Sequence, residues 1–218
     1  MRLAIFDLDG TLIDSVALIV ETVVASFTAA GQTVPDEKAI RAISGITARE
    51  ALGILAPDVD PVKVDLIMDI YRDEYLKRAG AGREPLFGGA LAALDRLQAD
   101  PETVIAVATG KGYNGAITLL ESHGIIDRFD SIQTPDHNRG KPHPQMIETA
   151  MQKAGIERGR TVMIGDTVHD MRMARAANVG AIGVAWGYHE IVELEEAGAH
   201  LVLHSFDELD AAIAKLVN

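Results

Sequence analysis

The sequence predicts an α/β fold: a three-layer core built on a parallel sheet, with an all-helical domain inserted near its start. Two observations lead to this prediction. From about residue 86 onward, short apolar runs alternate with segments of helical periodicity, which is typical of strands that helices cover on both faces. Between about residues 15 and 83, only helical patterns occur. We therefore expect a core of residues 1–14 and 84–218 and a helical insertion of residues 15–83.

The chain opens with an apolar run at residues 3–6 that predicts a strand, and two carboxylates follow it. Side chains alternate between faces in an extended chain, so Asp7 and Asp9 can project the same way, and Gly10 allows the backbone to turn. Two neighbouring carboxylates repel each other unless a positive charge lies between them. Oxygen ligands suit Mg²⁺ and leave coordination positions for water and a substrate phosphate. This segment indicates a metal-assisted site, with an Asp-Gly turn after an ordinary strand as the alternative.

Four helices are expected in the insertion. The break at residues 44–46 separates the second of these helices from the third. After the fourth helix, the cluster of Gly80, Gly82 and Pro85 predicts a linker back to the core. The expected helices are residues 14–31 with Asp14 or Ser15 as the cap, residues 35–43 beginning at Pro35 or Asp36, Ala48–Leu55 with Thr47 as the cap, and Pro61–Arg78.

After the insertion, helices and strands are expected to alternate. The expected strands are Thr103–Ala108, 129–133, 161–164, 181–185 and Leu201–Leu203. The expected helices are 89–98, 113–123, 144–154, 170–177 and 206–216.

Polar side chains follow three of the expected strands. Parallel strands present their carboxyl ends at one edge of the sheet, where α/β proteins bind ligands, so we expect these residues to lie together. They are Asp7, Asp9, Thr109, Gly110, Lys111, Asp166 and Asp170. Four carboxylates at one edge are more negative charge than a fold gathers without a cation. The alternative is that Asp166 is a helix N-cap and Asp170 a solvated acid in the first turn.

Lys141 lies in a segment with two prolines just before an expected helix, so its position is restrained. It can pair with the acids and with a phosphate oxygen, as a point charge where negative charge develops. The Thr109 hydroxyl and the N–H after it are suited to hold a phosphoryl oxygen. Lys111 could also bind the substrate, and the alternative is that it is a solvated charge on the surface. We expect His143 and His169 to be helix caps or surface imidazoles without a catalytic role.

Composition narrows the classes of function. With 218 residues and 48% hydrophobic content, the chain can form one packed core with a modest insertion. The formal net charge of -12, without a Lys/Arg run, argues against binding nucleic acid. No apolar run is long enough to span a membrane, no signal peptide is recognisable, and there are no cysteines. We expect a cytoplasmic protein, a monomer or homodimer, without membrane or nucleic-acid partners.

The ordered motifs Asp7-Leu8-Asp9-Gly10-Thr11, Thr109, Lys141 and Gly165-Asp166 with Asp170 resemble the four motifs of the haloacid dehalogenase superfamily. The whole chain resembles the phosphoglycolate-phosphatase-like branch, in which the helical insertion is a cap domain on a Rossmann-like core. The resemblance implies that Asp7 is the nucleophile and Asp9 the general acid and base. It also implies that Asp7, the backbone carbonyl of Asp9 and Asp166 bind Mg²⁺. Asp170 would act directly or through water and position Lys141.

The activity that this resemblance implies is Mg²⁺-dependent hydrolysis of a small phosphorylated metabolite through an aspartyl-phosphate, with phosphoglycolate as the first candidate. The alternatives are a sugar-phosphate mutase similar to β-phosphoglucomutase, a pyrophosphatase, and a non-catalytic phosphate-binding protein. The mutase branch usually bears a histidine where this chain has Ile19. Dehalogenases of the superfamily lack the second acid of the first motif, which is Asp9 here.

Residues that bind the substrate are expected in both domains. In the core they are Gly10, Thr11, Gly110 and Lys111, and in the cap they are Gly45 and Arg49. The loop of residues 44–49 is a Gly-containing break between two helices that can close over the leaving group. Arg49 is its one cationic side chain and is expected to meet the part of the substrate beyond the phosphate. The alternative is a solvated arginine that pairs with an acid.

Overall fold

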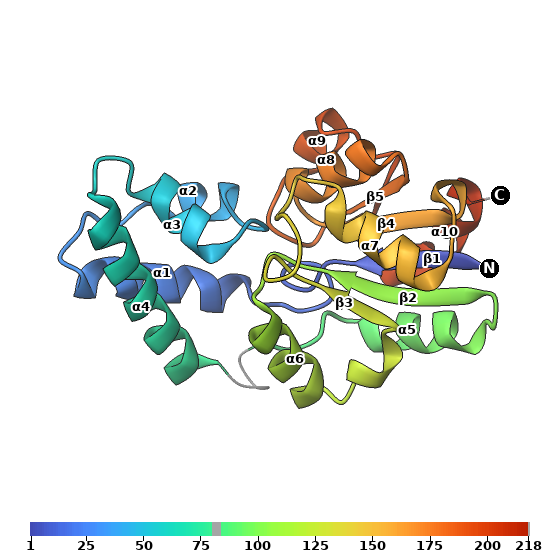
Figure 1. Cartoon of the computed structure of the whole chain (residues 1–218), viewed down its shortest axis with the longest axis horizontal. Helices are drawn as coiled ribbons and strands as arrows, with labels where there is room; N and C mark the ends of the chain where they lie inside the picture. Colours follow the sequence, from blue (N-terminus) through green and yellow to red (C-terminus); the bar gives the residue numbers. More distant parts are fainter. Residues whose placement is uncertain (80–83, 218) are drawn as a thin grey trace.

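The computed structural model describes residues 1–79 and 84–217. Within these residues a six-stranded parallel sheet forms the centre of the core, and a helical cap lies at one end of the molecule (Figure 1). The strands are β1 (Arg2–Phe6), β2 (Thr103–Ala108), β3 (Ser131–Gln133), β4 (Thr161–Gly165), β5 (Gly180–Val184) and β6 (Leu201–Leu203). Their order in the sheet is β3-β2-β1-β4-β5-β6.

Helices cover both faces of this sheet because the strand side chains are apolar on both. One layer consists of α5 (Ala90–Ala99), α6 (Tyr113–Ser122) and α10 (Leu209–Leu216), and the other of α7 (Gln145–Ala154), α8 (Val168–Ala177) and α9 (Ile191–Glu196). Ala4 and Phe6 of β1 belong to the core cluster of the first layer, whereas Leu3 and Ile5 belong to that of the second. The predicted three-layer α/β core is therefore confirmed.

The cap has an apolar core of its own. Its helices are α1 (Val16–Ala29), α2 (Glu37–Ala42), α3 (Ala48–Leu55) and α4 (Pro61–Arg78). Val23, Phe27, Leu52 and Ile67 are buried between them, each at most 3% exposed. The helical insertion thus buries apolar surface independently of the sheet. We keep residues 15–83 as the proposed extent of this domain; Gly80 and Gly82 of the predicted linker lie outside the described residues.

The starts of two cap helices follow from their capping side chains. Asp36 accepts a hydrogen bond from the Ala39 N–H at 2.7 Å, and Thr47 accepts one from the Glu50 N–H at 3.3 Å. Ser15 is the N-cap residue of α1, but its side chain makes no capping hydrogen bond. Its hydroxyl lies 3.5 Å from the Tyr188 hydroxyl of the core instead. The first cap helix therefore begins at a contact between the two domains.

Some elements differ from the prediction. The short helix α9 was not predicted, because its six residues, three of them acidic, are too few to give a clear periodicity. Helix α8 begins at Val168 rather than at residue 170, because Thr167 caps it. Strand β3 is limited to Ser131–Gln133, and residues 206–208 form a 3₁₀ turn before α10.

The topology brings the predicted polar residues to one edge of the sheet. Asp7 follows β1, Thr109 follows β2 and Asp166 follows β4, all at carboxyl ends of parallel strands. The strand order reverses direction between β1 and β4, which is where open α/β sheets bind ligands. Among the described helices, none has the length and apolar character that crossing a membrane requires.

Candidate active site

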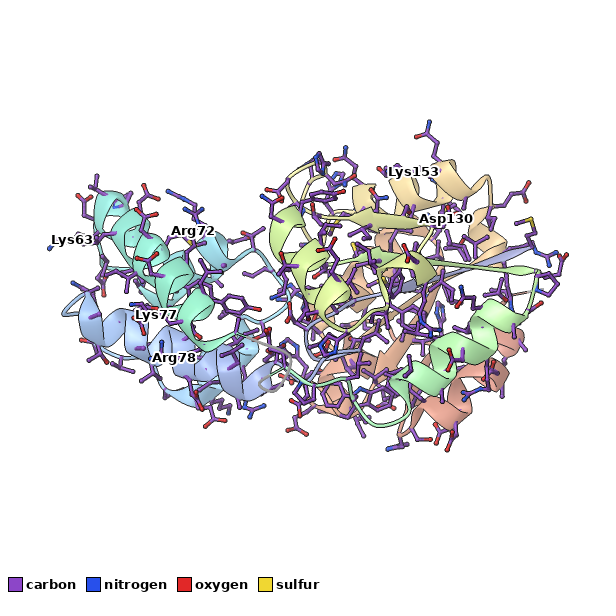
Figure 2. The ribbon with its side chains drawn as sticks, turned by 90° about the horizontal axis from the view of Figure 1, so that it is seen from below. Lys63, Arg72, Lys77, Arg78, Asp130 and Lys153 are labelled. Carbon is purple, nitrogen blue, oxygen red and sulfur yellow. The ribbon has the colours of Figure 1, made fainter. Side chains whose placement is uncertain are left out.

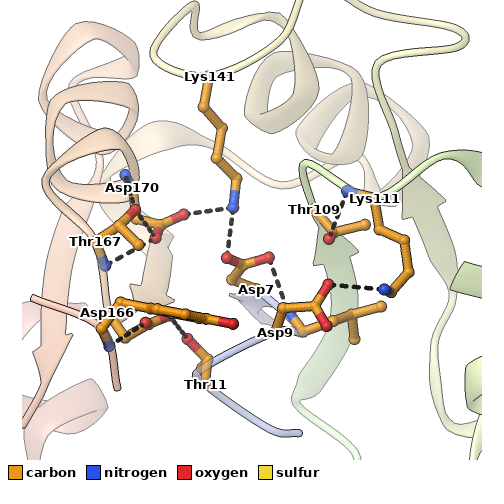
Figure 3. Close-up of polar contacts among 11 residues, drawn as sticks. Asp7, Asp9, Thr11, Thr109, Lys111, Lys141, Asp166, Thr167 and Asp170 are labelled. Carbon is orange, nitrogen blue, oxygen red and sulfur yellow. Dashed lines mark hydrogen bonds and ion pairs between the residues drawn. The ribbon is translucent and has the colours of Figure 1, made fainter. Parts of the chain in front are cut away.

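Three buried carboxylates meet where β1 and β4 end. Asp7, Asp166 and Asp170 each offer an oxygen, and these oxygens lie within 4.8 Å of one another. The three residues are at most 1% exposed. Asp7 comes from the end of β1, whereas Asp166 and Asp170 come from the turn after β4 and the first turn of α8 (Figure 3). The predicted convergence of acids on one edge is present in the structure.

Lys141 lies between two of these acids. Its Nζ is 2.7 Å from Asp7 Oδ2 and 2.6 Å from Asp170 Oδ1, and Figure 3 shows the side chain reaching down between them. Burial alone would lower the pKa of Lys141, but the charges of Asp170 and Asp7 raise it above its usual value. The lysine is therefore a fixed cation at the centre of the site, as the two prolines that follow it suggested.

Asp166 is held from two sides. One carboxylate oxygen accepts a hydrogen bond from the Thr11 hydroxyl at 2.8 Å, and the other accepts one from the Tyr188 N–H at 2.8 Å. A Cβ on Gly10, where φ is 81°, would lie 2.2 Å from Asp166 Oδ2, and a Cβ on Gly187 would be as close to Asp166 Cβ. Both glycines are thus required by the close approach of this acid. Thr11 and Gly10 position Asp166, and neither lines the cavity described below.

Asp170 belongs to the capping box of α8. Its Oδ2 accepts hydrogen bonds from the Thr167 hydroxyl at 2.6 Å and the Thr167 N–H at 3.1 Å, while Thr167 in turn caps the helix. The alternative interpretation, with Asp166 as the N-cap and Asp170 solvated, is wrong on both counts. Both oxygens of Asp170 are engaged, one by Thr167 and one by Lys141. This arrangement favours Asp170 as a residue that positions Lys141.

The charge balance of the cluster fits a divalent cation. Burial raises the pKa of Asp7 to about 7, although Lys141 opposes the shift, and burial also raises the pKa of Asp166 well above its usual value. One lysine does not compensate three buried carboxylates. A divalent cation would offset the excess negative charge, and the donor set of carboxylate oxygens is that of Mg²⁺.

Asp9 faces a separate buried cation. Its Oδ2 is 3.2 Å from Lys111 Nζ, and Lys111 donates a hydrogen bond to the Tyr75 hydroxyl of α4 at 2.9 Å. Tyr75 donates to the carboxylate of Glu84, which is 2% exposed. Lys111 is only 12% exposed in its side chain, so the alternative of a solvated surface charge is wrong. Neither Tyr75 nor Glu84 was singled out in the sequence, because Tyr75 fits the apolar stripe of a helix and Glu84 has no motif.

The loop after β2 touches the loop between α2 and α3. Thr109 is buried, and its hydroxyl accepts a hydrogen bond from the Lys111 N–H at 3.1 Å. A Cβ on Gly110 would lie 2.6 Å from the Gly45 carbonyl oxygen, and a Cβ on Gly45, where φ is 93°, would lie 2.7 Å from Thr167 Oγ1. Both glycines are therefore required where cap and core meet. They also line the cavity, and their contact with the substrate stays a prediction.

A cavity of about 730 Å³ lies between the domains, with Asp7 and Asp9 at its core end. Arg49 lines it, but its guanidinium is 2.7 Å from Asp65 and its side chain is 61% exposed. In this arrangement Arg49 matches the alternative of a solvated arginine paired with an acid. Figure 2 labels Lys63 and the lining residue Arg72 on the same cap helix, and Lys153 on the core.

The two histidines of this region have structural partners. His143 accepts a hydrogen bond from the Gln145 N–H at 3.2 Å at the start of α7. His169 packs edge-on against His189, with ring centroids 6.1 Å apart, and burial lowers the pKa of His169 to about 4. Neither histidine lines the cavity. We assign neither of them a catalytic role.

Comparison with known proteins agrees with this geometry. Residues 4–184 match the family model of the haloacid dehalogenase-like hydrolases. The chain is 35% identical to a protein named probable phosphatase IndB from Dickeya dadantii, over 99% of this chain and 94% of that protein. It is 32% identical to a phosphoglycolate phosphatase from Agrobacterium fabrum, again over 99% of this chain and 94% of that protein.

A solved structure is similar over the full length. The crystal structure of a hydrolase from Pseudomonas syringae superposes with a TM-score of 0.88 at 25% identity, covering 100% of both chains. Other relatives bear the names N-acetylmuramic acid 6-phosphate phosphatase and pyrophosphatase. These curated relatives are thus all named as phosphatases or pyrophosphatases, but their names differ in the substrate.

Proposed function

This chain belongs to the haloacid dehalogenase-like hydrolase family and is a phosphatase, and we propose that it hydrolyses a phosphate monoester through an aspartyl-phosphate on Asp7. The observation that carries the proposal is the environment of Asp7. Its carboxylate lies at the cavity, 2.7 Å from the Lys141 ammonium and within the acid cluster. A nucleophile beside a fixed cation and a candidate metal site is what phosphoryl transfer requires.

The first half of the reaction forms a bond between a carboxylate oxygen of Asp7 and phosphorus. The bond from phosphorus to the alcohol oxygen breaks, and its electron pair leaves with that oxygen, which takes a proton from Asp9. Lys141 offsets the negative charge of the phosphoryl oxygens as a point charge. Thr109, which follows β2 and lines the cavity, would donate its hydroxyl to one of these oxygens.

The second half returns the enzyme to its starting state. Asp9, now ionised, takes a proton from a water molecule, and the water oxygen attacks phosphorus. The bond between phosphorus and the Asp7 oxygen breaks, so that inorganic phosphate leaves and the Asp7 carboxylate is restored. Lys111 and Tyr75 hold the Asp9 side chain near the cavity throughout.

Mg²⁺ is the proposed cofactor. Asp7, Asp166 and the backbone carbonyl of Asp9 would hold it, with Asp170 positioning Lys141 from beside the site. When bound, Mg²⁺ would neutralise charge on the transferred phosphoryl group and keep the carboxyl of Asp7 ionised despite its burial.

Phosphoglycolate is the first substrate to test, since it is in the names of relatives such as the Agrobacterium fabrum protein. Pyrophosphate is the second, since it is in the name of another relative. A sugar-phosphate mutase is a weaker candidate because Ile19, which lines the cavity, stands where that branch usually has a histidine. Because isoleucine is apolar, Ile19 can act neither as an acid nor as a base at this position.

The test is phosphate release from p-nitrophenyl phosphate, with chelator and after Mg²⁺ is added back. We expect activity to disappear with chelator and to return with Mg²⁺, and Ca²⁺ to inhibit because its larger, looser coordination sphere disturbs in-line geometry. Full activity in excess chelator would contradict the metal assignment. Absence of turnover on every phosphate ester, with Mg²⁺ present, would favour the non-catalytic phosphate-binding alternative.

A further inference from the structure

The cavity is large for a small acid such as phosphoglycolate. Its volume of about 730 Å³ is within the range of pockets that enclose whole cofactors and drug-sized ligands. Asp7, Asp9 and Thr109 at its core end occupy only the part where the phosphate is expected. The remainder is lined by residues of the cap helices and by core residues such as Asn114 and Asp136, so its lining indicates the chemistry of the leaving group.

The cap side of this cavity is mostly apolar. Ile19 of α1, Leu55 of α3 and Met68 and Tyr71 of α4 line it, and all four are only partly buried. Burial raises the pKa of Tyr71 to about 12, so its phenol stays neutral at physiological pH. Leu76 of α4 also lines the cavity, although it is 74% exposed. A ligand with apolar surface would bind favourably against such a wall, because binding removes that surface from water.

The cations that line the cavity already have acidic partners. Three described lining residues are cationic: Lys111 pairs with Asp9, Arg49 with Asp65 and Arg72 with Asp69. A second carboxylate on the substrate would have to compete for one of these cations. It would also lie in a cavity whose core end carries Asp7 and Asp9. The described cations of the lining therefore offer no unpaired partner to a leaving group that bears its own negative charge.

We propose that the physiological substrate is a phosphate monoester whose leaving alcohol carries an uncharged, apolar body, such as an aromatic ring or an alkyl chain, seated against α1, α3 and α4. This inference rests on the phosphatase function proposed above. The phosphate lies at Asp7 and Lys141, and the apolar body extends past Tyr71 towards Leu76. A two-carbon acid would leave most of this wall without contact.

The test compares two alkyl phosphates with the same kind of leaving oxygen. Propyl phosphate and 3-phenylpropyl phosphate both release a primary alkoxide, so a difference in kcat/KM reports on the contacts of the ring rather than on leaving-group chemistry. We expect 3-phenylpropyl phosphate to be preferred by about tenfold or more, and to be preferred over phosphoglycolate as well. Equal kcat/KM values for the two alkyl phosphates, or a preference for phosphoglycolate, would overturn the inference.

A pair of variants locates the contact. Leu76→Glu places a charge on the cavity wall, whereas Val62→Glu places one on the same helix at a residue that is 76% exposed and does not line the cavity. We expect the preference for the phenyl compound to fall at least about threefold in Leu76→Glu and to persist in Val62→Glu. An unchanged preference in Leu76→Glu would show that the ring does not use this wall and would refute the proposal.

These outcomes are distinguishable from failure of the proposed function. If the protein released no phosphate from either alkyl ester or from p-nitrophenyl phosphate with Mg²⁺, the phosphatase proposal itself would fail. If it hydrolysed both esters equally, the phosphatase proposal would stand and only the apolar leaving group would be rejected. Thermal unfolding of both variants controls for loss of the fold.

Discussion

On the core side of the cavity, Lys141 approaches Asp7 to 2.7 Å, and both side chains are at most 2% exposed. On the cap side, Arg49 approaches Asp65 to the same 2.7 Å, but the two side chains are 61% and 57% exposed. The distance between the charged atoms is the same in the two pairs, but the first pair is buried and the second is solvated. Charges in a low-dielectric interior interact strongly and cannot be left unpaired, whereas solvated pairs contribute little.

This difference separates the two tasks of the site. The core fixes the positions of a few buried charged groups, and these are the groups that would act on the phosphate. The cap offers apolar side chains and solvated cations, which can change without disturbing those charges. We therefore expect substitutions in the core to remove activity and substitutions in the cap to change which ester is preferred.

The largest effect is expected from Asp7→Asn. The amide has nearly the shape of the carboxylate but is not a competent nucleophile, so turnover should fall at least about 10⁴-fold. Phosphate release measures the rate, and thermal unfolding should show an intact fold. Asp65→Asn, which changes an acid of the cap, is the control and should keep its activity. Turnover by Asp7→Asn within tenfold of the original protein would refute the assignment of the nucleophile.

Lys141→Met tests the burial of charge directly. It leaves Asp7 and Asp170 without their cation in the interior, which should cost about 3–5 kcal/mol of the free energy of unfolding. Urea denaturation measures this loss. Lys153→Met, on an exposed residue of α7, is the matched control and should change stability by less than about 0.5 kcal/mol. Equal effects of the two substitutions would contradict the distinction between buried and solvated lysines.

Asp9→Asn should lower the rate while metal binding persists. The substitution removes the proton donor and acceptor but keeps the backbone carbonyl that is expected to bind Mg²⁺. Turnover of an alkyl phosphate should fall at least about 10²-fold. Titration with Mg²⁺, followed by thermal stability, should be unchanged. Near-normal turnover of the alkyl ester would show that Asp9 is not the general acid.

Tyr75→Phe tests the one polar connection from the cap to the acid Asp9 that the described contacts reveal. The hydroxyl that joins Lys111 to Glu84 is lost, and we expect a cost of about 1–2 kcal/mol in stability because Glu84 remains buried. Denaturation of Tyr75→Phe is compared with that of Tyr113→Phe, where the ring is 40% exposed. A loss no larger than that of the control would mean that this connection is not stabilising.

The smallest effect is expected at Arg49. A double-mutant cycle of Arg49→Ala and Asp65→Ala should give a coupling energy below about 1 kcal/mol, because the pair is solvated. Unfolding free energies of the four proteins measure it. If Arg49 does bind the substrate after closure of the cap, Arg49→Ala would instead lower kcat/KM for that substrate while p-nitrophenyl phosphate is unaffected.

Local sequence patterns were sufficient to predict most helices and strands and the acids of the site. Strands such as Thr103–Ala108 and helices such as Pro61–Arg78 have the predicted bounds, since local periodicity records which face is buried. Asp7 and Asp166 could be predicted to converge, because parallel strands end at one edge. Both conclusions use only local sequence patterns and a general rule of sheet topology.

The pairing of the polar side chains could not be predicted, because it depends on how distant segments pack together. Asp170 is a buried member of a capping box, Lys111 is held by Tyr75 of the cap, and Arg49 turns to Asp65. The apolar character of the cavity was equally invisible, because residues such as Met68 serve the cap core and the cavity wall at once. Pattern in a sequence records burial, but the partner of a buried charge depends on which distant segment packs against it.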